Sequence, residues 1–147
     1  MNHLATSKED ILAASRDLIK ENGWAAVSIR AVASRCSVSA GTIYNYYESK
    51  ADLLSDTIES IWHEIFFHPE DEQIFHDVES CISWIYERLE YGNRQFPGFF
   101  SLHSFGFMRD EKTSGKKRMM KTWGHILNGL CEVLENDPKV RADVFDQ

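Results

Sequence analysis

Apolar residues recur at helical spacing along nearly the whole chain, and this spacing limits the possible folds more than any other feature of the sequence. The first run covers residues 11–19 and follows a capping box at residues 7–10. The strongest run covers residues 54–65, where apolar side chains recur at steps of four and three behind a second capping box at residues 49–52. No stretch alternates apolar and polar residues as a half-buried strand does. The sequence therefore predicts an all-α fold.

Turn-forming and helix-breaking residues divide this pattern into separate helices. Asn22-Gly23 ends the first helix, and His68-Pro69 ends the fourth. After Pro69 the apolar spacing continues from Ile74 and predicts a helix that ends at Tyr91-Gly92. We expect helices at residues 8–22, 29–36, 39–47, 50–67, 74–91 and 114–136, an aromatic-rich helix that begins near Pro97, and a last helix that begins near Val140 and is cut at Gln147.

Residues 28–50, with the sequence SIRAVASRCSVSAGTIYNYYESK, have the pattern of a helix-turn-helix. Ser28 and Ser39 can each cap a short helix, and residues 36–38 form the turn between them. Small residues at the start of the second of these helices allow its backbone to approach a major groove closely. Polar side chains such as Thr42 and Asn45 could then contact base edges. This stretch indicates a DNA-binding function.

Composition excludes several other classes of protein. No run approaches the roughly 18–20 uninterrupted apolar residues of a membrane span, and the polar start of the chain does not have the pattern of a secretory signal. Cys36, Cys81 and Cys131 are odd in number and far apart, which argues against a disulfide scaffold or a zinc module. The net charge of −7 argues at first against nucleic-acid binding. However, residues 1–50 hold six basic and five acidic side chains, whereas residues 51–147 hold ten basic and eighteen acidic ones, so the acidic charge belongs to the second part.

Residues 28–33 (SIRAVA), 38–47 (VSAGTIYNYY) and 49–54 (SKADLL) closely resemble the DNA-binding domain of the TetR family of bacterial transcriptional regulators. The resemblance covers about residues 7–66. It implies a helix-turn-helix DNA-binding domain over residues 1–50, joined by a long fourth helix to a helical ligand-binding and dimerisation domain over residues 51–147. It further implies a cytoplasmic homodimer that binds a palindromic double-stranded DNA operator, most commonly as a repressor, and is released by a small-molecule effector. No contact with a membrane is expected.

The resemblance also assigns DNA contacts to individual residues. Arg30 would contact a phosphate or a base, Tyr44 and Tyr46 would bind phosphates, Asn45 would point toward bases, and Lys50 would hold a phosphate. Tyr47 is assigned to packing. The alternative for Tyr44 and Tyr46 is that they too are core aromatics. The complete predicted set is Ser28, Arg30, Ser39, Ala40, Gly41, Thr42, Tyr44, Asn45, Tyr46 and Lys50.

Large aromatic side chains after residue 51 are typical of a pocket between helices that binds a largely apolar ligand. The candidate lining residues are Trp62, Phe66, Trp84, Phe99, Phe107 and Trp123, with Thr57, His103 and Asn128 as polar anchors. A ligand that separates these helices would move the fourth helix, change the spacing of two recognition helices and lower the affinity for DNA. The alternative is that aromatic residues at helical spacing are plain core.

Members of this family usually carry two further long helices that build the dimer interface, whereas this chain stops in its last expected helix. We therefore expect the second domain to be incomplete. The chain is then either a fragment, or a short variant that dimerises through another surface such as the helix at residues 114–136.

Two other functions are alternatives to DNA-binding regulation. An enzyme would need convergent catalytic groups or metal ligands, but the six histidines are scattered and show no His-Glu-x-x-His or similar spacing. We therefore expect no enzymatic activity, no cofactor and no metal site. The second alternative is a helical protein-interaction module without specific DNA binding.

Overall fold

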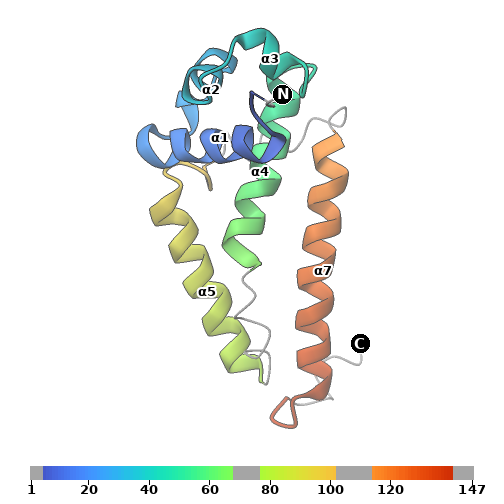
Figure 1. The fold of residues 1–147 in the computed structure, drawn as a ribbon. Coiled ribbons are helices and arrows are strands. Elements are labelled where there is room, and N and C mark those ends of the chain that lie inside the picture. The colour runs from blue at the N-terminus through green and yellow to red at the C-terminus, as the bar shows by residue number, and fades with distance from the viewer. Residues whose placement is uncertain (1–4, 68–76, 102–113, 141–147) are drawn as a thin grey trace.

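The computed structural model describes residues 5–67, 77–101 and 114–140, and the regular elements in these ranges are all helical (Figure 1). This confirms the predicted all-α fold. The α-helices are α1 (Lys8–Asn22), α2 (Ile29–Arg35), α3 (Ala40–Tyr44), α4 (Lys50–Phe66), α5 (Val78–Gln95) and α7 (Ser114–Asn136), and a 3₁₀ turn, η1 (Trp24–Ala26), follows α1.

The predicted caps begin the first four α-helices. Before α1, Ser7 Oγ accepts from the Asp10 amide at 3.1 Å while the Asp10 carboxylate accepts from the Ser7 amide at 3.2 Å. Ser28, Ser39 and Ser49 each accept from a backbone amide three residues later, at the starts of α2, α3 and α4. These bonds satisfy amide groups that have no partner within the helix. At the other end of α1, Gly23 has a φ of 85°, a backbone conformation that residues with a side chain rarely adopt.

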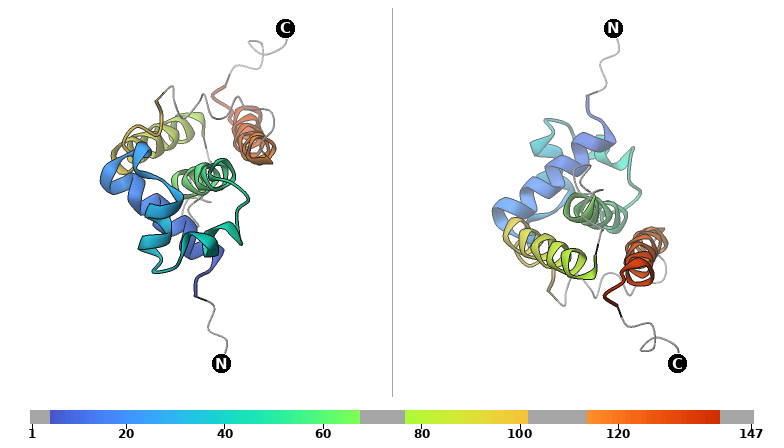
Figure 2. Two further views of the ribbon diagram at one scale, coloured as in Figure 1. Left: turned by 90° about the horizontal axis from the view of Figure 1, so that it is seen from above. Right: turned by 90° about the horizontal axis from the view of Figure 1, so that it is seen from below.

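Helices α1, α2 and α3 gather at one end of the molecule, and α4 runs away from them between α5 and α7 (Figures 1 and 2). Helices α4 and α7 run in the same direction, and α5 runs in the opposite one (Figure 1). One continuous core of buried side chains, from Ile11 to Phe99, crosses the expected domain boundary at residue 50. The division into two domains stays a prediction.

Polar contacts at successive turns join α1 to α4. At the centre, the hydroxyl oxygens of Ser15 and Thr57 lie 2.9 Å apart, and both residues are fully buried. On either side of this pair are the contacts Lys8–Asp56, with a nitrogen-to-oxygen distance of 3.3 Å, Arg16–Ser60, and Lys20–Glu64 at 3.1 Å. These contacts fix the position of α4 along α1.

The C-terminal end of α4 is held by α5. The Arg88 guanidinium donates to the carbonyl oxygens of Glu64, at 3.4 Å, and Ile65. Gly92 lies against α4 with no room for a side chain, since a Cβ there would be 2.6 Å from Ile65 Cδ1. The prediction that α5 ends at Gly92 was wrong: the glycine serves close helix packing, and α5 continues to Gln95.

Other details of the second half also differ from the sequence-based expectation. Ile82 and Leu89 belong to the apolar repeat that predicts this helix, yet they are 57% and 36% exposed, because α5 turns Cys81 and Trp84 inward. Residues 96–101, expected to begin a helix, form turns with a φ of 79° at Gly98.

Some of the expected features lie outside the described residues: Ile74, His103, Phe107 and most of the last expected helix. No helix in the described ranges is long and apolar enough to cross a membrane.

Candidate nucleic-acid interface

The turn between α2 and α3 is fixed by backbone bonds. The Val38 amide donates to the Ala33 carbonyl at 3.0 Å, and the Ser37 amide donates to the Ser34 carbonyl at 3.1 Å. Ser37 has a φ of 56°, in the left-handed region that lets the chain reverse direction over a short distance. The two short helices and this turn form the predicted helix-turn-helix.

Buried and exposed side chains of this unit lie at different positions of α3 and the residues after it. Ile43 and Tyr47 are buried, so Tyr47 packs in the core as expected. None of the ten predicted DNA-binding residues is buried. Arg30, Ser39, Gly41, Tyr44, Asn45 and Lys50 are exposed, and Ser28, Ala40, Thr42 and Tyr46 are half-buried.

Some of the predicted contacts already have partners within the chain. Ser28 Oγ and Ser39 Oγ accept the capping amides of their helices, and Thr42 Oγ1 lies 3.1 Å from Ser39 Oγ. The Tyr46 hydroxyl donates to the Thr6 carbonyl at 2.7 Å, which ties the segment before α1 to the end of the helix-turn-helix. A phenol has one proton to donate, so Tyr46 can donate to a phosphate only if this bond breaks. Tyr44, 52% exposed, carries no such bond within the described residues.

Ion pairing distinguishes the basic side chains of residues 1–50. The Arg35 guanidinium donates two bonds to the Glu21 carboxylate, at 2.8 and 2.5 Å, and this pair lowers the pKa of Glu21 and raises that of Arg35. Lys8 pairs with Asp56, and Arg16 and Lys20 pair with Glu64. Arg30 and Lys50 enter no ion pair in the part of the chain that the structure describes. The two cations left for DNA are therefore both in the predicted set.

Five of the predicted pocket residues meet in one aromatic cluster at the centre of the helices. The Trp62 ring lies 5.6 Å from Phe66, 5.3 Å from Phe99 and 4.8 Å from Trp123, measured between ring centroids. Phe66 in turn lies 5.8 Å from Trp84. Trp62 is 3% exposed, and its indole N–H has no hydrogen-bond partner within the described residues.

The other predicted pocket residues lie elsewhere. The Thr57 hydroxyl is hydrogen-bonded to the Ser15 hydroxyl between α1 and α4, and Asn128 is exposed on α7. His103 and Phe107 are outside the described ranges.

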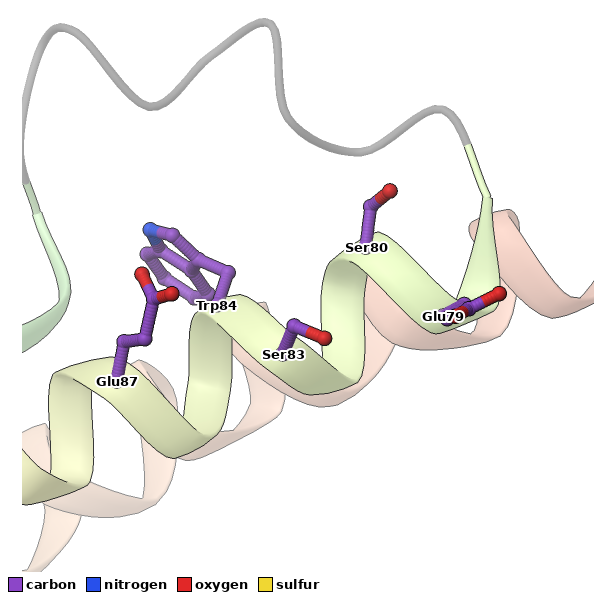
Figure 3. Close-up of a pocket in the computed structure, with 5 residues that line it drawn as sticks. All are labelled: Glu79, Ser80, Ser83, Trp84 and Glu87. Atoms are coloured by element: carbon purple, nitrogen blue, oxygen red, sulfur yellow. The ribbon is translucent and has the colours of Figure 1, made fainter.

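A hollow of about 330 Å³ lies along α5, and it shares only Trp84 with the predicted pocket. Figure 3 shows its lining side chains, Glu79, Ser80, Ser83, Trp84 and Glu87, all rising from this one helix. The spacing of four between Glu79, Ser83 and Glu87 could have shown from the sequence that these residues share a face. No group of three or more metal-ligating side chains was found in the described ranges.

Comparison with known proteins agrees with the helix-turn-helix. Residues 11–57 match the family model described as bacterial regulatory proteins, tetR family. The HTH-type transcriptional regulator UidR of Escherichia coli is 38% identical over 48 residues, which cover 33% of this chain and 24% of that protein. The HTH-type transcriptional repressor KstR is 45% identical over 47 residues in Rhodococcus jostii and 43% in Mycobacterium tuberculosis, covering 32% of this chain and 22% and 21% of those proteins.

The match spans less than a quarter of the length of each of these relatives. No solved structure was found to match the chain. The aligned region nevertheless contains α2, the turn, α3 and the cap of α4, all with the geometry described above. Residues 11–57 of this chain therefore match the tetR family of bacterial regulatory proteins in sequence, and the same residues contain a helix-turn-helix.

Proposed function

We propose that this protein is a sequence-specific DNA-binding transcriptional regulator, and that it represses until a small, largely apolar ligand releases it from its operator. The observation that carries the DNA-binding part is the distribution of free positive charge. Of the basic side chains in residues 1–50, those held in ion pairs lie on α1 and at the end of α2, whereas Arg30 and Lys50 stay unpaired within the described residues. In the sequence these two residues lie on either side of α3, Arg30 in α2 and Lys50 at the start of α4.

The exposed residues of α3 and of its C-terminal cap have the chemistry of a base-reading surface. Gly41 presents no side chain, so the helix backbone can approach a groove closely. Asn45 is exposed and can donate to and accept from a base edge, while the exposed Tyr44 can donate to a phosphate. The half-buried Ser28, Thr42 and Tyr46 would contact DNA as part of the same surface.

Two free cations per copy support only weak binding by a single copy. Each neutralised phosphate contributes a salt slope of about −0.9, so one copy would show a slope of about −2 and two copies about −4. We therefore propose a homodimer on two half-sites of a palindromic operator, about one turn of DNA apart. The interaction would take place in the cytoplasm.

The aromatic cluster supports a ligand-binding role for the second half of the chain. Its rings come from α4, α5, α7 and the turn after α5, so a molecule inserted among them would move α4 against its neighbours. The unpartnered indole N–H of Trp62 favours a ligand with an aromatic or apolar body and one hydrogen-bond acceptor. Since α4 begins at Lys50, its displacement would reach the DNA-binding face directly.

The test is selection of bound duplexes from a random pool, followed by titration of the selected duplex against variants. We expect Lys50→Ala to weaken binding to all sequences and to reduce the salt slope by about one per copy. Lys139→Ala is the matched control, because it removes the same charge from an exposed position after α7 and should leave binding unchanged. Asn45→Ala should change the preferred sequence, since base contacts specify and phosphate contacts position.

The alternative function is a helical protein-interaction module without specific DNA binding. It predicts that no sequence is enriched in the selection and that Lys50→Ala and Lys139→Ala behave alike. Either outcome would refute the proposed regulator. An enzymatic role is not proposed, because the family matches are to transcriptional regulators.

A further inference from the structure

The outer face of α7 carries apolar residues that nothing in the described structure covers. Met120 is 66% exposed, Leu127 is 55% exposed, and Cys131 is exposed as well. A Cβ added to Gly124 would meet no atom within 4 Å. The spacing of four, three and four places Met120, Gly124, Leu127 and Cys131 on one stripe, which we call the α7 seam. This spacing is typical of a helix that pairs with another helix.

The seam points away from the rest of the molecule. Trp123 and Ile126, which lie to one side of the seam on α7, pack against the core. Figure 2 shows α7 at the edge of the molecule when seen along its axis, with its outer side free of other described helices. A second helix can therefore approach the seam without moving α4 or α5.

Charge is distributed unequally along α7. The basic residues of the helix lie in its first half, at positions 116, 117, 118 and 121, and Glu132 and Glu135 lie near its end. Two such helices in parallel would bring like charges together at both ends. Two in antiparallel orientation would bring the basic half of each against the acidic end of the other, and this complementarity favours the antiparallel arrangement.

The seam also fits an antiparallel pair in one particular register. Its four residues are symmetric about the point between residues 125 and 126. Pairing about this point sets Leu127 of each copy against Gly124 of the other, where the missing side chain leaves room for it. It also sets Met120 of each copy against Cys131 of the other, and brings Glu132 and Glu135 beside the basic segment.

We propose that the α7 seam binds the same seam of a second copy of this chain, antiparallel and in this register. The N-terminal end of α7 lies toward the helix-turn-helix end of the molecule (Figure 1). The antiparallel pair therefore directs its two helix-turn-helix units to opposite ends, separated by at least the length of α7, which is about 35 Å for its 23 residues. If the proposed DNA-binding function holds, this pair connects two duplex segments, and it is distinct from the arrangement that reads two half-sites side by side.

Disulfide trapping in the full-length chain, without DNA, tests this pairing. In the proposed register the two Cys131 residues are eleven positions apart along the helices, about 16 Å, which is too far for a disulfide. We expect the wild-type chain to stay uncrosslinked under mild oxidation by copper phenanthroline and air. M120C should form a covalent dimer, and M120C/C131S should not. I82C places a cysteine at another exposed apolar position, on α5, and is the matched control that should not crosslink.

Several outcomes would overturn the proposal. A disulfide between two wild-type chains through Cys131 would show a parallel pair or another register. If sedimentation shows a dimer but M120C forms no disulfide, the interface lies elsewhere on the molecule. If the chain sediments as a monomer at a few tenths of a millimolar, the seam does not bind a second copy. Because no DNA is present, any of these results leaves the proposed regulator untouched.

Variants of the seam give a second, non-covalent measurement. L127E should raise the dimer dissociation constant at least tenfold, and G124L should do the same by filling the space that receives Leu127. E132K/E135K should also weaken the dimer, most strongly at low salt, because like charges then face each other. Helical circular dichroism should be unchanged, since Leu127, Glu132 and Glu135 are exposed and a Cβ at the half-buried Gly124 would meet no atom within 4 Å. Equal dissociation constants for wild type and L127E would refute the pairing.

Discussion

The buried hydroxyl pair between α1 and α4 allows a quantitative prediction. Thr57 Oγ1 donates to the Leu53 carbonyl at 2.7 Å, and this uses its single proton. Ser15 must therefore donate the 2.9 Å bond between the two hydroxyls. Both residues are fully buried, so water cannot replace a lost partner. The cost of each substitution then depends on whether it leaves a polar group unpaired.

Thr57→Val preserves the shape of the side chain but leaves the Ser15 hydroxyl without its acceptor. We expect this to lower the free energy of unfolding by about 1–2 kcal/mol, toward the lower figure if Ser15 donates instead to the carbonyl four residues earlier in α1. In Ser15→Ala the Thr57 hydroxyl still donates to the Leu53 carbonyl, so the free energy of unfolding should fall by only roughly 0.5–1 kcal/mol. The double variant leaves no hydroxyl unpaired, so it should be more stable than the two separate costs imply, by about 1 kcal/mol.

The measurement is urea unfolding of the four proteins, followed by circular dichroism of the helices. Equal dependence of the free energy on urea in all four would show that the extent of unfolding is unchanged. If the two single costs add to that of the double variant within about 0.3–0.5 kcal/mol, the hydroxyls are not coupled and the reasoning fails.

Three further predictions concern other parts of the chain. Gly92→Ala should destabilise the fold by about 1–2 kcal/mol, because the cost of overpacking against Ile65 exceeds the gain in helix propensity. Gly124→Ala, whose added methyl group meets open space, should instead stabilise the monomer by up to about 1 kcal/mol in the same urea assay. Burial raises the pKa of the Cys81 thiol, so at mildly alkaline pH iodoacetamide should alkylate Cys81 far more slowly than the exposed Cys131 in the folded chain; equal rates by mass spectrometry would contradict this. Hydrogen bonds from the backbone amides of Val78 and Lys139 lower the pKa of Asp137, so the stability that its carboxylate contributes is complete above the unfolded-state pKa and is lost as pH falls through the folded-state value. Asp137→Asn should therefore flatten the plot of unfolding free energy against pH below about pH 4, and an unchanged plot would contradict the assignment.

The parts of the fold that sequence predicted depend on short-range chemistry. Each of the serine caps acts on an amide three residues away, so the serines at positions 7, 28, 39 and 49 locate the first four α-helices without knowledge of the tertiary structure. The burial of Ile43 and Tyr47 follows from the same local periodicity. The helix-turn-helix was therefore accessible from residues 28–50 alone.

The errors in α5 arise from contacts with distant residues. A glycine late in a helix usually marks its end, and only the proximity of Ile65 shows that Gly92 is there for packing. The apolar spacing of Ile82 and Leu89 fits a helix equally well with either face inward, and the neighbouring α4 selects the face that holds Trp84. Tertiary packing thus overrides a local pattern where two patterns compete.

The candidate site shows the same limit. Sequence identified Arg30 and Lys50 as DNA contacts, but could not show that they stay free of ion pairs. Arg35 is neutralised by Glu21, fourteen positions earlier in the chain, and no helical spacing relates the two. The placement of Trp62 against rings from α7 and the turn after α5 likewise depends on how the helices assemble.

The polar contacts at successive turns between α1 and α4 restrict how the molecule can move. A slide of α4 by one turn, about 5.4 Å, would separate the buried hydroxyls of Ser15 and Thr57 and remove Lys8 from Asp56. Helices α1 and α4 must therefore tilt together as one rigid unit, and Arg88 of α5 holds the C-terminal end of α4. A displacement of α5 at this contact would then tilt α1 together with α4.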